Sequence, residues 1–174
     1  MDTDQVTYFV PRMSFLEAVK ACFKKYATFR GRARRSEYWW FYLFTALGGL
    51  VSTVLDSLFV NNTLFPVFGI ILNLAVILPS LAVSVRRLHD TNRSGWYILL
   101  PFAGAVVFVA SIAITGAAAT ASGIELGGGT GAIIVIFGVL LMLGFSIYLL
   151  YLFIKDSDPG PNRFGPSPKY PASV

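Results

Sequence analysis

Apolar residues fall into four long runs that are separated by short polar connections. The runs extend over residues 39–60, 64–85, 96–119 and 132–154. Each is long enough for a helix that crosses the hydrocarbon layer of a bilayer, which needs about 20 mainly apolar residues. Prolines and glycines inside the runs are tolerated, because neighbouring helices satisfy the backbone groups that they free. The pattern predicts an all-α, polytopic membrane protein with a bundle of four transmembrane helices.

A shorter amphipathic segment precedes the first run. Ser14 and Glu17 have the spacing of a capping box, which marks the start of a helix. Apolar side chains then recur on one helical face, at Phe15, Val19, Cys22, Phe23 and Tyr26. We expect this helix to lie in the membrane interface or to pack against the ends of the transmembrane helices. The chain thus divides into an N-terminal segment (1–37) with this amphipathic helix, a transmembrane domain (38–154) and a tail rich in proline and glycine (155–174).

Composition supports a membrane location. Hydrophobic residues make up 55% of the 174 residues, charged residues make up 13%, and the mean hydropathy is +0.66. Ordinary soluble domains are about 45–50% apolar and about 25% charged. A soluble protein of this composition would expose large apolar patches and aggregate. The formal net charge of +5 must therefore be interpreted by its position along the chain.

The basic residues occur only in alternate connections. Eight of the 14 precede the first run, three lie between the second and third runs, and three lie in the tail. The connections around residues 61–62 and 125–130 contain none. This segregation follows the positive-inside rule for four spans with both termini in the cytoplasm.

Tryptophans occupy the predicted starts of two spans. Trp39 and Trp40 begin the first run, and Trp96 begins the third. Amphipathic indole rings favour the headgroup layer. We therefore predict these three residues to be membrane-interface anchors.

Two polar residues lie inside predicted spans. Asp56 is near the outer end of the first span, and Asn73 is in the second. Ionisable groups within membranes often face a cavity or a proton relay, but Asp56 could also reach the headgroups. Asn73 could form a hydrogen bond to a neighbouring helix.

Charged residues also gather at the predicted cytoplasmic ends of the spans. These candidate site residues are Arg32, Arg35, Glu37, Arg86, Arg87, His89, Asp90 and Arg93. Arginine pairs with carboxylates and phosphates through its planar, two-pronged guanidinium group. The cluster therefore predicts either a salt-bridged collar that fixes helix order or a site for anionic lipid headgroups.

Other chemistries receive little support from the sequence. A single cysteine, Cys22, and a single histidine, His89, exclude the usual multi-cysteine and zinc sites, and no cofactor is indicated. His89 and Asp90 are adjacent, but adjacent side chains seldom point at each other, and no nucleophile stands at a recognisable spacing. Nucleic-acid binding is not expected, since the aromatic residues among the arginines are explained by the membrane interface.

Three segments carry a family resemblance: residues 29–41 (FRGRARRSEYWWF), 85–97 (VRRLHDTNRSGWY) and 162–168 (NRFGPSP). In this order they resemble the YhaH/YhaI-like family of bacterial inner-membrane proteins, which is known as a domain of unknown function. The chain departs from the family's common residues at Arg34, Asn92, Tyr97 and Phe164, and no charge of the signatures is lost. The resemblance implies an inner-membrane location and four helices, and it implies no known activity.

Three functions are compatible with these features of the sequence. The leading hypothesis is a non-enzymatic accessory protein whose arginine-rich cytoplasmic face binds anionic lipids, a protein partner or a second copy of the chain. The alternative is a small transporter or channel component that uses Asp56 and Asn73. An interfacial enzyme that uses His89 is the weakest of the three.

Overall fold

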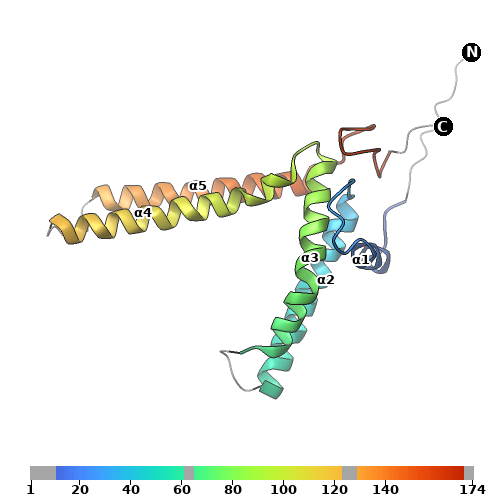
Figure 1. Ribbon diagram of the computed structural model, residues 1–174, viewed down its shortest axis with the longest axis horizontal. Helices are drawn as coiled ribbons and strands as arrows, with labels where there is room; N and C mark the ends of the chain where they lie inside the picture. The colour runs from blue at the N-terminus through green and yellow to red at the C-terminus, as the bar shows by residue number, and fades with distance from the viewer. Residues whose placement is uncertain (1–10, 61–64, 123–128, 171–174) are drawn as a thin grey trace, which may run out of the picture. The chain divides into compact units, whose positions relative to one another are not determined.

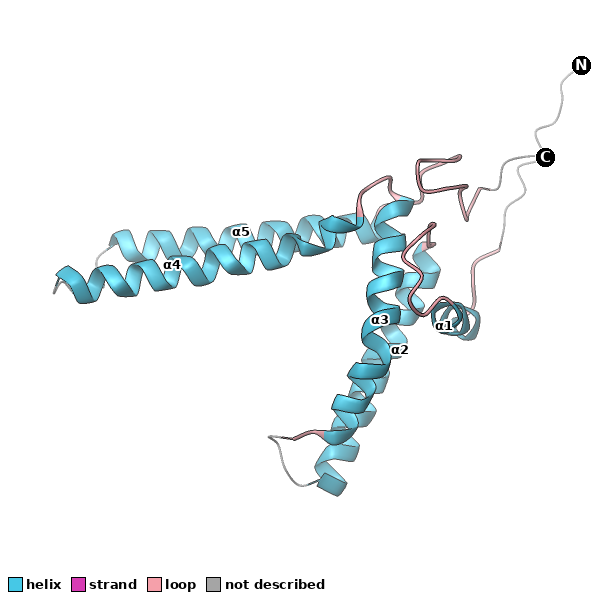
Figure 2. Ribbon diagram, viewed as in Figure 1, coloured by secondary structure: helices cyan, strands magenta, loops and turns pink. Residues whose placement is uncertain are grey.

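A computed structural model describes residues 11–60, 65–122 and 129–170, and every regular element in these ranges is a helix (Figures 1 and 2). The elements are α1 (Phe15–Lys24), α2 (Arg35–Leu55), the π-helical turn η1 (Asp56–Val60), α3 (Val67–Asp90), the 3₁₀ turn η2 (Gly95–Leu99), α4 (Leu100–Ser122) and α5 (Gly129–Ile154). The connections at 61–64 and 123–128, which the charge pattern assigns to the outer side, lie outside the described residues.

Within the described ranges, four helices are long and apolar enough to cross a membrane, as the sequence predicts. They extend over Arg35–Val60, Val67–Asp90, Gly95–Ala117 and Gly131–Ile154. The first begins four residues before the predicted run and the second ends five residues after it, because both helices continue into charged segments. The described residues divide into two compact units: those within residues 1–95 and 155–174 form the first, and those within residues 96–154 form the second. Packing of all four helices into one bundle stays a prediction.

In the first unit, α1 packs against α2 and α3. The capping box at its start is present: the Ser14 amide donates to Glu17 Oε2 at 2.8 Å, and Ser14 Oγ accepts from the Glu17 amide. Phe23 packs edge-on against the ring of Phe41, and Phe15 packs edge-on against Trp40. Helix α1 thus packs on the transmembrane helices, and its Leu16 side chain remains 64% exposed. Whether α1 also lies in the membrane interface stays a prediction.

Helix α3 ends in a Schellman motif. The Asn92 amide donates to the His89 carbonyl at 3.0 Å, and the Arg93 amide donates to the Leu88 carbonyl at 2.9 Å. Asn92 has a φ of 55°, the left-handed conformation that this motif requires and that glycine usually supplies. Asparagine tolerates this conformation better than most residues do, so Asn92 can supply it in place of a glycine.

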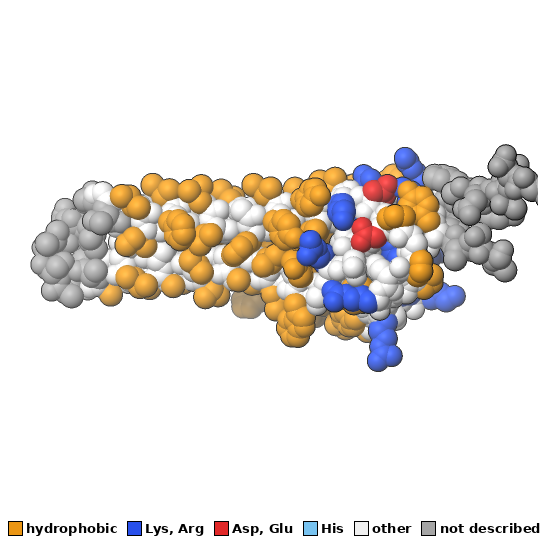
Figure 3. All heavy atoms as spheres, turned by 90° about the horizontal axis from the view of Figure 1, so that it is seen from above, with side chains coloured by type: hydrophobic (Ala, Val, Ile, Leu, Met, Phe, Trp, Pro, Cys, Tyr) orange, Lys and Arg blue, Asp and Glu red, His pale blue; other side chains and the backbone are white. Residues whose placement is uncertain are grey.

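In the second unit, α4 and α5 form an antiparallel pair with charge-free surfaces (Figure 3). The helices approach closely at two glycines. A Cβ atom on Gly104 would lie 2.7 Å from Met142 Cα, and one on Gly138 would lie 3.1 Å from Phe108 Cα. Small residues at such positions let the backbones of membrane helices pack closely.

Candidate functional site at the charged end of the first unit

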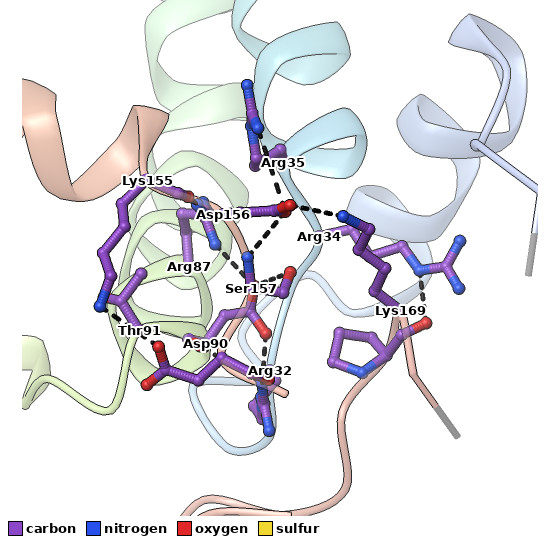
Figure 4. A network of polar contacts seen from close by, with 12 residues as sticks. Arg32, Arg34, Arg35, Arg87, Asp90, Thr91, Lys155, Asp156, Ser157 and Lys169 are labelled. Atoms are coloured by element: carbon purple, nitrogen blue, oxygen red, sulfur yellow. Dashed lines mark hydrogen bonds and ion pairs between the residues drawn. The ribbon is translucent and has the colours of Figure 1, made fainter. Parts of the chain in front are cut away.

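Residues from all three signature segments meet at one end of the first unit. Arg32 lies in the extended segment before α2, Arg87 and Asp90 lie in the last turn of α3, and the tail passes beside them (Figure 4). The extended segment is held to α3 by a hydrogen bond from the Ala33 amide to the Arg86 carbonyl at 3.0 Å. Segments 53 or more residues apart in the sequence thus form one polar cluster.

Asp90 is the centre of this cluster. Its Oδ1 accepts from Arg32 Nε at 2.9 Å, and its Oδ2 accepts from Arg87 Nη1 at 2.6 Å and from Ser157 Oγ at 2.5 Å. The side chains of Asp90, Arg32 and Arg87 are at most 1% exposed. A buried carboxylate and its partners are stable only when the remaining donors and acceptors are satisfied as well. We call Arg32, Arg87, Asp90 and Ser157 the Asp90 hub.

Other donors of the hub bind the backbone of the tail. Arg32 Nη1 donates to the Gly160 carbonyl at 2.8 Å, and Arg32 Nη2 donates to the Asp158 carbonyl at 2.6 Å. Arg87 Nη2 donates to the Lys155 carbonyl. The tail has no regular helix or strand in its described part, as its proline and glycine content predicts, but its backbone is fixed by these arginines.

Glu37 and Arg86 form a second buried ion pair. Arg86 Nη1 lies 2.5 Å from Glu37 Oε1, and the two side chains are 1% and 4% exposed. Cys22 of α1 is buried beside them, and the pKa of its thiol is raised to about 12 by burial and by the charge of Glu37, which Arg86 partly opposes. This pair connects α2 to α3 and is covered by α1.

His89 has a packing role in the described structure. Its ring stacks on Phe164 with centroids 3.8 Å apart and planes 4° apart, and its Nδ1 lies 3.1 Å from the Gly31 carbonyl oxygen. The Asp90 carboxylate instead binds Arg32, Arg87 and Ser157. The side chains of His89 and Asp90 therefore have separate partners.

The predicted site residues thus separate into buried and accessible groups. Arg32, Glu37, Arg86, Arg87 and Asp90 are buried in ion pairs, whereas Arg35 is half exposed, with Nη1 3.9 Å from Asp156 Oδ1. The backbone amide of Arg93 completes the Schellman motif. The pattern of charges in the sequence could not separate these groups, because burial depends on where the tail lies.

An amphipathic cavity of about 560 Å³ lies beside the hub. We call it the Arg35 cavity; it is lined by Arg12, Met13, Arg34, Arg35, Ser36, Trp39, Trp40, Leu43, Asp156, Ser157 and Lys169. Four basic side chains and one acidic side chain thus line the same space as two tryptophans and a leucine. Trp40 is fixed by a hydrogen bond from its Nε1 to the Met13 carbonyl at 3.0 Å.

Asp156 holds two of the basic groups of the Arg35 cavity. Its Oδ2 lies 2.5 Å from Lys169 Nζ, and Figure 4 shows its carboxylate between Lys169 and Arg35. The hydrogen bond from Lys169 lowers the pKa of Asp156, and the same bond raises the pKa of Lys169. Both groups are therefore charged at neutral pH.

Eight residues of this site were not among the predicted site residues: Arg12, Met13, Arg34, Ser36, Leu43, Asp156, Ser157 and Lys169. Arg34 donates to the Pro168 and Pro11 carbonyls, and burial lowers its pKa. The third family signature, residues 162–168, lies directly before Lys169 and is the sequence signal that could have pointed to the tail as part of the site. In that signature, Asn162 Nδ2 donates to the His89 carbonyl at 2.9 Å.

The polar residues of the spans have local backbone partners. The carboxylate of Asp56 accepts hydrogen bonds at 2.9 Å from the Phe68 and Gly69 amides, so it caps the first turn of α3. The Asn73 side-chain amide donates to the Gly69 carbonyl of its own helix at 2.8 Å. This N–H group therefore does not form the predicted hydrogen bond to a neighbouring helix. Of the predicted anchors, Trp39 and Trp40 line the Arg35 cavity and Trp96 is 77% exposed.

No cluster of three or more histidine, cysteine, aspartate or glutamate residues that could hold a metal ion occurs in the described ranges. The hub contains one carboxylate for two arginines, which is the reverse of the charge balance that a cation site needs.

Comparisons of the chain with a family model and with curated proteins point to the same family. Residues 26–166 match the family described as a protein of unknown function, DUF805. Inner membrane protein YhaH of Escherichia coli (strain K12) is 33% identical over 152 residues, which are 84% of this chain and 91% of YhaH. Inner membrane protein YhaI of the same organism is 43% identical over 89 residues, which are 49% of this chain and 74% of YhaI. No solved structure matches the chain. Together with its four candidate spans, these matches show that the chain is a multi-pass inner-membrane protein that belongs to the DUF805 family.

Proposed function

We propose that this protein is a non-enzymatic accessory protein of the inner membrane that binds an anionic lipid in the Arg35 cavity, on the cytoplasmic side. The observation that carries the proposal is the lining of the cavity, where four basic side chains stand beside two tryptophans. The basic side chains can bind an anionic lipid headgroup, and the tryptophans can pack against the start of an acyl chain. Each basic residue near an anionic surface contributes about 1 kcal/mol of attraction.

The buried arginines are poor candidates for the same task. Arg32, Arg86 and Arg87 are at most 1% exposed in their side chains and are already paired with carboxylates. A ligand could reach them only after these pairs were broken, at a cost of several kcal/mol for each desolvated charge. Arg35 and Lys169, in contrast, keep 47% and 25% of their side-chain surface exposed. We therefore assign the hub a structural role and the cavity the binding role.

The charge pattern supports a cytoplasmic placement of this site. The basic residues before α2, after α3 and in the tail belong to the segments that the positive-inside rule assigns to the cytoplasm. The inner leaflet carries anionic lipids, so the site and its ligand would be on the same side.

Native mass spectrometry of the full-length protein, released gently into detergent, tests the proposal. We expect retained anionic phospholipid on the wild-type protein and retention reduced about tenfold or more in the Arg35→Gln/Lys169→Gln variant, since two basic contacts are lost. Lys20→Gln/Arg30→Gln is the matched control, because it removes two exposed basic charges of the same unit that do not line the cavity. Thermal unfolding monitored by tryptophan fluorescence checks that both variants are folded.

Three results would contradict the proposal. Equal loss in the two variants would mean that only net charge matters, and zwitterionic lipid retained as well as anionic lipid would mean that the headgroup charge is not recognised. A protein partner or a second copy retained in place of lipid would identify a different occupant of this face.

A further inference from the structure

We infer that Asp156 occupies the place of the ligand's anionic group in the Arg35 cavity, and that the ligand is a lipid whose headgroup is a phosphomonoester. This inference rests on the proposed function. It adds the chemical class of the headgroup and the role of the Asp156 carboxylate as a competitor of the ligand within the protein. It is carried by one arrangement: a single carboxylate lies between two basic groups that both line the cavity.

The geometry of Asp156 is that of a bridging anion. One carboxylate oxygen lies 3.9 Å from Arg35 Nη1 and the other lies 2.5 Å from Lys169 Nζ, so each oxygen faces a different cation (Figure 4). The 3.9 Å contact is longer than a hydrogen bond, so Arg35 retains donors for a ligand. Asp156 is itself 49% exposed, unlike Asp90, and an exposed ion pair of this kind is worth about 1 kcal/mol or less. The carboxylate can therefore leave at low cost.

The two cations favour a doubly charged headgroup. A ligand that displaces Asp156 must supply at least the negative charge that the carboxylate gives. A phosphodiester carries one negative charge and only equals it. A phosphomonoester has a second pKa near 6, so it carries close to two charges at neutral or higher pH, on three strongly accepting oxygens. The fork of Arg35 and the ammonium group of Lys169 can then bind different oxygens of one phosphate.

The walls of the cavity favour a lipid over a free phosphate compound. Trp39, Trp40 and Leu43 line it on the side of α2, and these residues belong to the candidate span Arg35–Val60. An acyl chain that starts beside these apolar side chains would continue along a helix surface that already faces the hydrocarbon. A soluble phosphate ester would leave this apolar part of the cavity without a partner.

The test compares two lipids with identical acyl chains, phosphatidic acid as the phosphomonoester and phosphatidylglycerol as the phosphodiester. Each is titrated into the full-length protein and bound lipid is measured by native mass spectrometry, with phosphatidylcholine as the zwitterionic reference. At pH 8 we expect phosphatidic acid to bind about fivefold or more tightly than phosphatidylglycerol, and the difference to shrink at pH 5.5, where the phosphomonoester loses its second charge.

Variants of the two tail aspartates test the role of Asp156. Asp156→Asn is expected to increase the affinity for both anionic lipids several-fold, on the order of tenfold for phosphatidic acid, because the internal competitor is removed. Asp158→Asn is the matched control: it makes the same change in net charge two residues away, where the carboxylate pairs with Lys155 and does not line the cavity. Asparagine at 156 can still accept the hydrogen bond from the Ser157 amide, so the tail should keep its path.

The outcomes separate this inference from the proposed function. One outcome is that anionic lipids bind better than phosphatidylcholine while the Asp156→Asn variant binds them no more tightly than the Asp158→Asn variant. In that case Asp156 does not compete with the ligand, and the proposed function stands. If phosphatidylglycerol equals phosphatidic acid at pH 8, the headgroup class is wrong. Glycerol 3-phosphate that displaces the lipid at equal concentration would overturn the lipid as occupant. If no anionic lipid exceeds phosphatidylcholine, the proposed function fails and this inference fails with it.

Discussion

The hydroxyl group of Tyr26 donates a hydrogen bond of 2.9 Å to the carbonyl oxygen of Ala75. In an uninterrupted helix this carbonyl would accept from the amide four residues later, at position 79, but Pro79 has no N–H to donate. Tyr26 therefore satisfies the acceptor that the proline leaves open in the middle of α3. A residue that follows α1 thus compensates for an irregularity inside a transmembrane helix, as the membrane requires of its backbone polar groups.

Removal of this hydroxyl should destabilise the protein. Tyr26→Phe is expected to lower the free energy of unfolding by about 1 kcal/mol, the usual contribution of one hydrogen bond. In a Pro79→Ala background the same substitution should cost less, because the new amide can donate to Ala75. Unfolding in mixed micelles with increasing denaturing detergent measures both values. Equal costs in the two backgrounds would contradict the compensation.

The close approach of α4 and α5 predicts a steric effect at Gly104. Gly104→Ala places a Cβ atom against the backbone of Met142, which cannot rotate away, and should destabilise the helix pair by about 1–3 kcal/mol. Gly116→Ala is the control in the same helix, since nothing lies within 4 Å of its Cβ position. The measurement is thermal unfolding of the purified variants; a Gly104→Ala protein as stable as Gly116→Ala would show that the helices do not meet at this residue.

The Asp90 hub predicts that one carboxylate fixes both α3 and the tail. Asp90→Asn leaves the buried charges of Arg32 and Arg87 without their partner, which should cost about 3–5 kcal/mol. The tail should also become accessible, so trypsin should cleave after Lys155 and Arg163 faster than in the wild-type protein. Asp158→Asn serves as the control, because its side chain is in a half-exposed pair with Lys155. Unchanged cleavage in Asp90→Asn would mean that other contacts hold the tail.

The buried thiol of Cys22 predicts slow alkylation of the folded protein. Its pKa is raised to about 12, chiefly by burial, so almost no thiolate exists at pH 8. Iodoacetamide should modify Cys22 only after denaturation, as measured by the mass of the intact protein. Cys22→Ala/Lys20→Cys, which moves the thiol to an exposed position of α1, should react quickly. Rapid labelling of folded wild-type protein would contradict the burial of α1 against α2 and α3.

The same thiol gives a direction for the dependence of stability on pH. The pKa is higher in the folded protein than the ordinary value of 9.0, so the unfolded chain loses the proton first as the pH rises. The contribution of Cys22 to stability is complete below pH 9 and declines between about pH 9 and pH 12. Cys22→Ala should weaken this decline at alkaline pH.

The class of the protein and its main elements can be predicted from the amino-acid sequence alone. The four apolar runs predict the four long helices because the length needed to cross a bilayer is fixed by its thickness. The capping box at Ser14 and Glu17 predicts the start of α1 because both hydrogen bonds of the box are local in the chain. Three short signatures predict the family, which the match over residues 26–166 confirms.

Which charges are buried and which line a cavity depends on the folded arrangement of distant segments. Arg32, Arg35 and Arg87 look alike in the sequence, yet two of them bind Asp90 in the interior and Arg35 reaches Asp156 at the cavity. Asp156 and Lys169 lie in a tail without regular structure, so no periodicity marks them. The role of an arginine depends on its distance to a carboxylate far away in the chain, and folding sets that distance. Helix formation and membrane insertion, in contrast, depend on neighbouring residues.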